Sequence, residues 1–228
     1  MNRIARRSLV VFTVAQLLAT TAILTAVGTL CAQPSAAQRP AKKLIEYGWD
    51  VPFPDQVRKD IRTMEKRPFD GIIFRLREWN HAFDPRPWDE TQLKPQFDDL
   101  AAIEWEAFTD NFLCLYAANN WNMDWFNDEQ WKGITANLQL SAKAAKIGRC
   151  VGIVFDPEPY GDNPWAHTAD QGHSFAEVES QVSKRGAQFI TAIQTELPDV
   201  RLLTFFHQSL FAELLDTPDI QERQKRLA

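Results

Sequence analysis

Cysteine is scarce in this chain of 228 residues, which contains only Cys31, Cys114 and Cys150. Three cysteines exclude a disulfide scaffold of the kind that stabilises many small secreted domains. Cys114 and Cys150 lie inside apolar runs, where a free cysteine usually packs as a small hydrophobic residue. A single disulfide between them stays open for the case in which the two runs form neighbouring strands.

Basic residues are in the minority, with 25 Lys and Arg against 30 Asp and Glu, and the formal net charge is −5. Residues 1–37 hold three of the arginines and no acidic residue, so the rest of the chain carries a net charge of −8. An acidic body argues against nucleic acid as a partner, because the phosphate backbone is itself negative. Apolar residues at 45% and charged residues at 24% are typical of a globular protein and exclude wholesale disorder.

Long apolar runs are also absent, except at the N-terminus. Residues 1–7 are basic, residues 8–30 carry no charge, and the small residues Ser35 and Ala37 follow, which is typical of a secretory signal. The run is long enough to span a bilayer, so an uncleaved membrane anchor is the alternative. We predict a signal peptide or anchor over 1–37, a linker over 38–43 and a single domain over 44–228. The protein is then secreted or periplasmic, with membrane contact only through an uncleaved N-terminal segment.

The body of the chain alternates between apolar runs and segments with helical spacing. Strands that alternate with helices pair in parallel through right-handed crossovers. The predicted fold class is therefore α/β, with parallel (β/α) units that form a partial or shortened TIM-type barrel of about five strands. A doubly wound open sheet is the alternative. The predicted strands are 44–50, 69–76, 111–118, 150–155 and 200–206, and the predicted helices are 55–67, 97–108, 126–147, a helix from the Ser174 cap to Leu197, and most of 209–227.

A glycine-rich phosphate loop is missing after the first predicted strand. The turn there is Trp49-Asp50-Val51-Pro52, which cannot cradle a pyrophosphate as the G-x-G-x-x-G motif does. This disfavours a dinucleotide-binding domain, and we predict no cofactor.

Five strands are too few to close a barrel that normally has eight. The first and fifth strands would then carry unpaired backbone N–H and C=O groups at open sheet edges. We therefore expect a homodimer through these edges, or poor solubility of the isolated monomer.

Polar and aromatic side chains follow the predicted strands at their C-terminal ends, where parallel α/β folds place their working residues. A tryptophan ring stacks on the apolar face of a sugar, while Asn, Asp, Arg and His bond its hydroxyls. The pattern predicts a carbohydrate ligand, although each tryptophan could instead fill a gap between loops. The candidate ligand-binding residues are Trp49, Asp50, Arg77, Asn119, Trp121, Tyr160, Trp165 and His207.

Asp156 and Glu158 are the candidate catalytic residues. They stand two positions apart at the end of the fourth predicted strand, so an extended chain would point both to the same side. Repulsion between two carboxylates raises the pKa of one of them, which suits it to act as a general acid. A solvated turn capped by Asp156 is the alternative. A metal site with His167 and His173 as further ligands is a weaker one, because the spacing is irregular.

Glu46 and Arg75 are predicted to form an ion pair inside the bottom of the barrel. Each lies on a predicted strand, and pairing would satisfy two buried charges. We favour this over a catalytic role for Glu46.

Two runs of sequence resemble bacterial secreted (β/α)8-barrel glycoside hydrolase-like proteins. They are Ile45-Glu46-Tyr47-Gly48-Trp49-Asp50 and Gly152-Ile153-Val154-Phe155-Asp156-Pro157-Glu158-Pro159-Tyr160. Many such hydrolases place an acid/base Glu at the end of the fourth strand, so the resemblance implies that role for Glu158. It implies a helper role for Asp156, as the second carboxylate that some members add.

This sequence departs from that family pattern after the fifth unit. Retaining members place a nucleophilic carboxylate on a late strand, and no sixth, seventh or eighth unit follows here. Members that use the substrate's own N-acetyl group need only a pair on strand four. The chain could thus be a truncated barrel, a compact hydrolase or a sugar-binding relic. The functional alternatives are a non-catalytic carbohydrate-binding protein on a degenerate barrel and a metal-dependent hydrolase.

Overall fold

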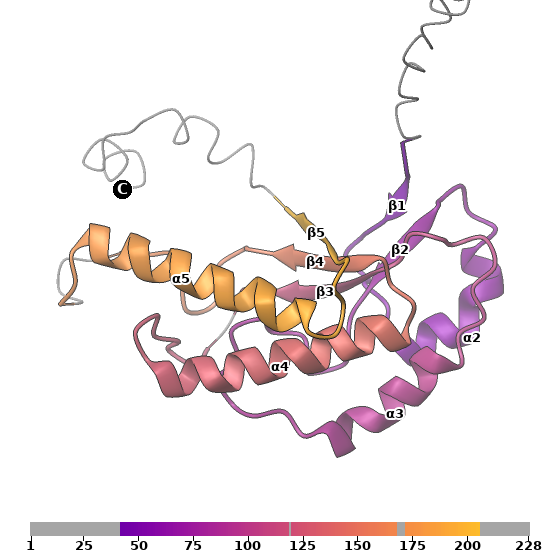
Figure 1. The fold of residues 1–228 in the computed structure, drawn as a ribbon. Coiled ribbons are helices and arrows are strands. Elements are labelled where there is room, and N and C mark those ends of the chain that lie inside the picture. The colour runs from indigo at the N-terminus through magenta and orange to yellow at the C-terminus, as the bar shows by residue number, and fades with distance from the viewer. Residues whose placement is uncertain (1–41, 119, 168–171, 206–228) are drawn as a thin grey trace, which may run out of the picture. The chain divides into compact units, whose positions relative to one another are not determined.

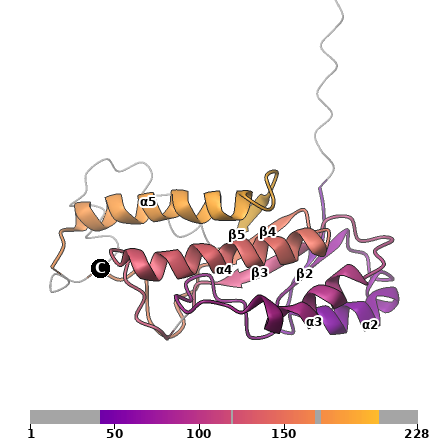
Figure 2. The same ribbon diagram turned by 60° about the horizontal axis from the view of Figure 1, so that its bottom comes forward.

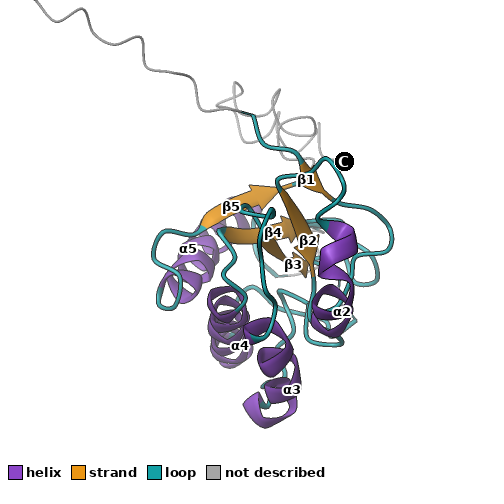
Figure 3. Ribbon diagram, turned by 90° about the vertical axis from the view of Figure 1, so that its right-hand side faces the viewer, coloured by secondary structure: helices purple, strands orange, loops and turns teal. Residues whose placement is uncertain are grey.

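The computed structural model describes residues 42–118, 120–167 and 172–205. They form a sheet of five parallel strands in the order β1-β2-β3-β4-β5, with a helix in each crossover (Figure 1). The sheet curls into a half-barrel with the helices around its outer face (Figure 3), which confirms the predicted fold class. In chain order the elements are β1 Ile45–Glu46, α2 Pro54–Met64, β2 Gly71–Phe74, α3 Glu90–Ala101, β3 Phe112–Tyr116, α4 Asp128–Ile147, β4 Gly152–Asp156, α5 Phe175–Gln194 and β5 Arg201–Thr204.

The two faces of the sheet bury different apolar sets. Successive side chains on a strand point to opposite faces. Phe74, Leu113 and Ile153 face the helices and join the larger core with Trp131 of α4. The inner face of the sheet carries the smaller core of Val51, Ile73, Phe112, Cys114 and Val154. Side chains in register with this second set therefore lie inside the half-barrel.

Polar residues fix where the helices begin. Ser174 caps α5 as predicted, and it forms a capping box with Glu177. The second predicted helix was placed over 97–108, but the corresponding helix α3 spans Glu90–Ala101. The side chain of Asp89 accepts a hydrogen bond from the Thr91 backbone N–H and starts the helix there. Pro95 is accommodated inside α3, because the Asp89 cap that starts the helix lies upstream of it.

The proposed disulfide does not form, because Cys114 and Cys150 are both free and buried. Cys114 packs in the inner core and Cys150 in the core under the helices. The two thiols lie on opposite sides of the sheet, so neighbouring strand positions could not bring them together.

The predicted ion pair between Glu46 and Arg75 is also wrong. Glu46 is in register with Ile72, which faces the helices, and it pairs with Arg67, which follows α2. Arg75 follows the register of Ile73 and contacts Tyr116 on the inner face. The two side chains lie on opposite faces of the sheet, because a shift of one residue along a strand moves a side chain to the other face.

The outer strands are short. Of the predicted strand over 44–50, only Ile45 and Glu46 pair with β2. The ring of Tyr47 then contacts the ring of Phe205, which follows β5, with 4.6 Å between centroids. The chain after β1 therefore meets the chain after β5 across the half-barrel, and these rings help to cover the inner core.

The exposure of β5 bears on the predicted dimer. All four residues of β5 are exposed, Leu202 and Leu203 among them. An exposed apolar edge strand is a site for pairing with another chain. We expect a concentration-dependent dimer in size-exclusion chromatography with light scattering, and a Leu203→Lys variant should shift it toward monomer. A monomer at all concentrations would contradict this prediction.

Among the residues that the structure describes, no helix is long and apolar enough to cross a membrane. The predicted signal or anchor over 1–37 and the predicted helix over 209–227 lie outside those residues.

Candidate functional site

Four side chains gather on the inner face near the C-terminal ends of the strands. Arg75 follows β2, Tyr116 ends β3, Asp156 ends β4, and Tyr47 follows β1. The Tyr47 hydroxyl donates to Oδ2 of Asp156 at 3.5 Å, and the Arg75 guanidinium lies 5.8 Å from the centre of the Tyr116 ring. Strand alternation puts these residues on one face, because each is two positions beyond an inner-core residue.

Asp156 is a buried carboxyl at this end of the sheet, with 6% of its surface exposed. Its Oδ1 accepts a hydrogen bond from the Glu158 backbone N–H at 3.2 Å. Burial raises the pKa of Asp156, and the negative charge of Glu158 adds to the rise, although hydrogen bonds from the Glu158 backbone and Tyr47 oppose it. Asp156 is thus a carboxyl that holds its proton more readily than a solvated one.

Glu158 lies beside Asp156 in a turn that the Asp156 side chain caps, as in the alternative left open by the sequence, although Asp156 is buried rather than solvated. β4 ends at Asp156, and the bond from the Glu158 backbone to the Asp156 side chain turns the chain there. Glu158 is half-buried in this turn rather than two positions along an extended strand. Its carboxylate hydrogen-bonds the Tyr160 hydroxyl, which raises the pKa of Tyr160.

Tyr47 joins the two ends of the curled sheet at this site. Burial raises the pKa of Tyr47 to about 12, with the neighbouring Cys114 and Asp156 adding to the rise. The phenol therefore keeps its proton at neutral pH and can donate it to the Asp156 carboxylate in a hydrogen bond. Sequence reasoning missed Tyr47 as a site residue, although its position two after Ile45 on an alternating strand places it on the inner face.

The tryptophans near the strand ends differ in how they are held. Trp49 follows β1 and is 99% exposed. Trp121 follows β3, contacts His81 at 5.1 Å between ring centroids and lies under the Arg86 guanidinium. Trp165 follows β4 and packs on Phe83, and its indole N–H donates to the Pro157 carbonyl at 2.7 Å. All three follow C-terminal strand ends of one parallel sheet, and Trp165 also supports the turn that carries Glu158.

The other candidate ligand-binding residues that the structure describes are not among the four inner-face side chains. Arg77 pairs with Asp55 at 3.0 Å and stacks on Phe53, so its charge is already matched. Asp50 and Tyr160 are exposed. Asn119 and His207 lie outside the described residues, and whether any of these residues binds a ligand stays a prediction.

The alternative metal site is not assembled. A ring nitrogen of His167 lies 3.0 Å from the His173 carbonyl, and the His173 ring stacks on Phe126. Within 42–118, 120–167 and 172–205, no three His, Cys, Asp or Glu side chains come together to hold a metal ion. The grouping of both histidines with Asp156 and Glu158 was therefore wrong.

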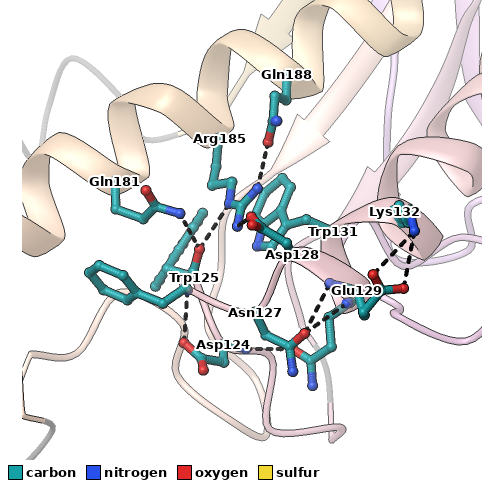
Figure 4. Close-up of polar contacts among 12 residues, drawn as sticks. Asp124, Trp125, Asn127, Asp128, Glu129, Trp131, Lys132, Gln181, Arg185 and Gln188 are labelled. Carbon is teal, nitrogen blue, oxygen red and sulfur yellow. Dashed lines mark hydrogen bonds and ion pairs between the residues drawn. The ribbon is translucent and has the colours of Figure 1, made fainter.

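The loop between β3 and α4 is anchored from behind by Arg185 of α5 (Figure 4). Its Nε donates to the Trp125 carbonyl at 2.8 Å, and its Nη2 pairs with Asp128 at 2.6 Å. The guanidinium also lies 5.1 Å from the centre of the Trp131 ring. Since α4 and α5 lie side by side (Figure 2), this buried cation locks both helices to the loop that carries Trp121 and Trp125.

A scan against protein-family models found no match, and a search of curated proteins also found none. Among solved structures, the chain is similar to the exo-beta-1,4-mannosidase Op5Man5 from Opitutaceae bacterium strain TAV5, with a TM-score of 0.44 and 20% identity. The similarity covers 69% of this chain and 29% of that one. The chain thus spans less than a third of that enzyme, and the similarity is too distant to assign its activity here.

Proposed function

We propose that this chain acts on a carbohydrate at the carboxyl pair formed by Asp156 and Glu158. The observation that carries the proposal is the buried Asp156 carboxyl, which lies beside a second carboxyl at the C-terminal end of β4. When two carboxyls lie side by side, one can donate a proton while the other stays ionised. Cleavage of a glycosidic bond uses a pair of carboxyl groups, so this pair supplies one part of such a site.

The two carboxyls take different roles in this proposal. Glu158 lies in the turn beyond β4, next to the exposed Tyr160, and meets the ligand as the general acid. Asp156 lies deeper and accepts hydrogen bonds from Tyr47 and from the Glu158 backbone. It holds the turn in place and supplies negative charge where positive charge develops on the sugar.

A carbohydrate-binding protein without turnover is the second candidate. It is favoured by the five strands of the described sheet, which include no late strand to carry the nucleophilic carboxylate of a retaining glycosidase. Aryl glycosides and oligosaccharides of several sugars distinguish the two candidates. Turnover together with binding supports the hydrolase, binding alone supports the second candidate, and neither would reject both. In either case we propose that the predicted N-terminal signal directs the protein out of the cytoplasm.

Trp49 provides a test of the aromatic surface that does not disturb the fold. Because its side chain is 99% exposed, a Trp49→Ala variant should melt at the wild-type temperature. Loss of ring stacking should cost about 1 kcal/mol of binding, roughly a fivefold weaker Kd, in a titration followed by tryptophan fluorescence or calorimetry. Arg58→Gln is the control, because Arg58 pairs with Asp99 between α2 and α3. Equal affinity in the wild type and Trp49→Ala would remove Trp49 from the ligand surface.

A further inference from the structure

Arg75 is a cation of the inner face that the proposed reaction does not use. Its neighbours Arg67 and Arg77 pair with Glu46 and Asp55. Within the described ranges, no carboxylate forms an ion pair with Arg75, and its buried Nε has no hydrogen-bond partner. A guanidinium that is partly removed from water usually has an acceptor for its N–H groups.

Aromatic rings hold Arg75 in place without neutralising it. The guanidinium lies 4.8 Å from the centre of the Phe53 ring and 5.8 Å from that of Tyr116. Such contacts fix the plane of the guanidinium and leave its N–H groups free to donate in that plane. The charge acts on the inner face, where it lowers the pKa values of Cys114 and Tyr116 in opposition to their burial.

Arg75 and Asp156 lie on the same face but on different strands. β2 and β4 both flank β3, so two strand spacings of about 4.8 Å separate them, roughly 10 Å across the sheet. A short oligosaccharide with one sugar at the carboxyl pair would present the next part of its chain to Arg75.

We propose that Arg75 binds the carboxylate of a uronic acid residue in the ligand, which makes the substrate an acidic oligosaccharide. The inference rests on the proposed function and adds to it the chemical class of the sugar. A planar guanidinium matches a carboxylate through two parallel N–H···O bonds. The protein body is acidic, with 30 Asp and Glu in the chain, so the attraction must come from a fixed local cation. A sulfate ester presents similar oxygens without the planar fork, and it serves as a separate arm of the test.

The test is calorimetric binding of three oligosaccharides that share a backbone, one uronate-containing, one sulfated and one neutral. The wild type should bind the uronate form about 10- to 100-fold more tightly than the neutral form, as expected for a hydrogen-bonded pair of charged groups. Arg75→Gln should bind the uronate and neutral forms with the same Kd, whereas Arg58→Gln should keep the preference for the uronate form. Arg75→Lys keeps the positive charge but loses the planar pair of N–H donors. Its preference for the uronate form should therefore fall between those of the wild type and Arg75→Gln. It also serves as the second variant if Arg75→Gln melts early.

Each result bears on a different claim. Equal binding of the uronate and neutral forms by the wild type would overturn this inference and leave the proposed function standing. A preference for the sulfated form alone would overturn the assignment to a uronic acid. A uronate preference that survives in both Arg75 variants would overturn the role of Arg75. Binding of none of the three would overturn the proposed function and this inference with it.

Discussion

An Arg185→Ala variant is expected to lose about 3–5 kcal/mol of unfolding free energy. Arg185 is 1% exposed, and its removal opens a cavity against Trp131 between α4 and α5. It also removes hydrogen bonds to the Trp125 carbonyl, Gln188 and Asp128. Urea unfolding followed by circular dichroism measures the loss.

Arg185→Met should cost much less, about 1–2 kcal/mol, because it keeps most of the volume over Trp131. The acceptors that Arg185 bonds in the wild type keep other partners in this variant. Gln181 still donates to the Trp125 carbonyl, and Asp128 is exposed to water. Asp128→Ala, in contrast, leaves the buried guanidinium without its anion, and it should destabilise the fold more than Arg185→Met does. A smaller loss in Asp128→Ala would show that this ion pair contributes little and that packing dominates.

The order of strands and helices could be predicted because it depends on local patterns. Short apolar runs alternate with helical spacing along the chain, and Ser174 with Glu177 marks the start of α5. The predicted helix over 97–108 began too late because a proline such as Pro95 usually interrupts a helix. Here Asp89 caps α3 so far upstream that Pro95 falls inside it.

The site was harder to predict, because it depends on which face of the sheet each side chain of β1 points to and on the turn after β4. Reading β1 one residue out of phase put Glu46 on the same face as Arg75, whereas Tyr47 is the residue that points inward. Asp156 and Glu158 were correctly read as neighbours, but a hydrogen bond from the Glu158 backbone brings them together rather than strand alternation. The contact between Tyr47 and Phe205 joins the two ends of the sheet, and no local pattern predicts it.

Replacing Asp156 with asparagine is expected to reduce glycoside turnover by at least about 100-fold, because it removes the negative charge that stabilises the positive charge developing on the sugar. Asparagine keeps an oxygen that can accept from Tyr47 or from the Glu158 backbone, and it cannot ionise. Glu158→Gln should reduce turnover by a similar factor. The pH dependence of kcat/KM should lose its acidic limb in Asp156→Asn, because that limb reports the carboxylate that must be ionised.

The folding stability of Asp156→Asn should not fall with its turnover. The pKa of Asp156 is higher in the folded chain than in the unfolded chain. Its contribution to stability is complete below the unfolded value of 3.8 and is lost as the pH rises through the folded-state pKa. At pH 7 the unfolded chain gains more free energy than the folded chain from ionising this carboxyl, so Asp156 opposes folding. Asp156→Asn should therefore unfold at the same urea concentration as the wild type or a higher one.

Asp84 is the matched control, because it is also a buried aspartate, with 1% of its surface exposed. Burial alone would raise the pKa of Asp84, but hydrogen bonds from Arg86 and Trp88 lower it overall. Its contribution is complete above 3.8 and is lost as the pH falls through the lowered folded-state pKa. Asp84→Asn should therefore destabilise the fold at pH 7, where Asp156→Asn does not. If both variants lose stability equally, Asp156 is a structural carboxylate, and if Asp156→Asn keeps its turnover, it takes no part in the reaction.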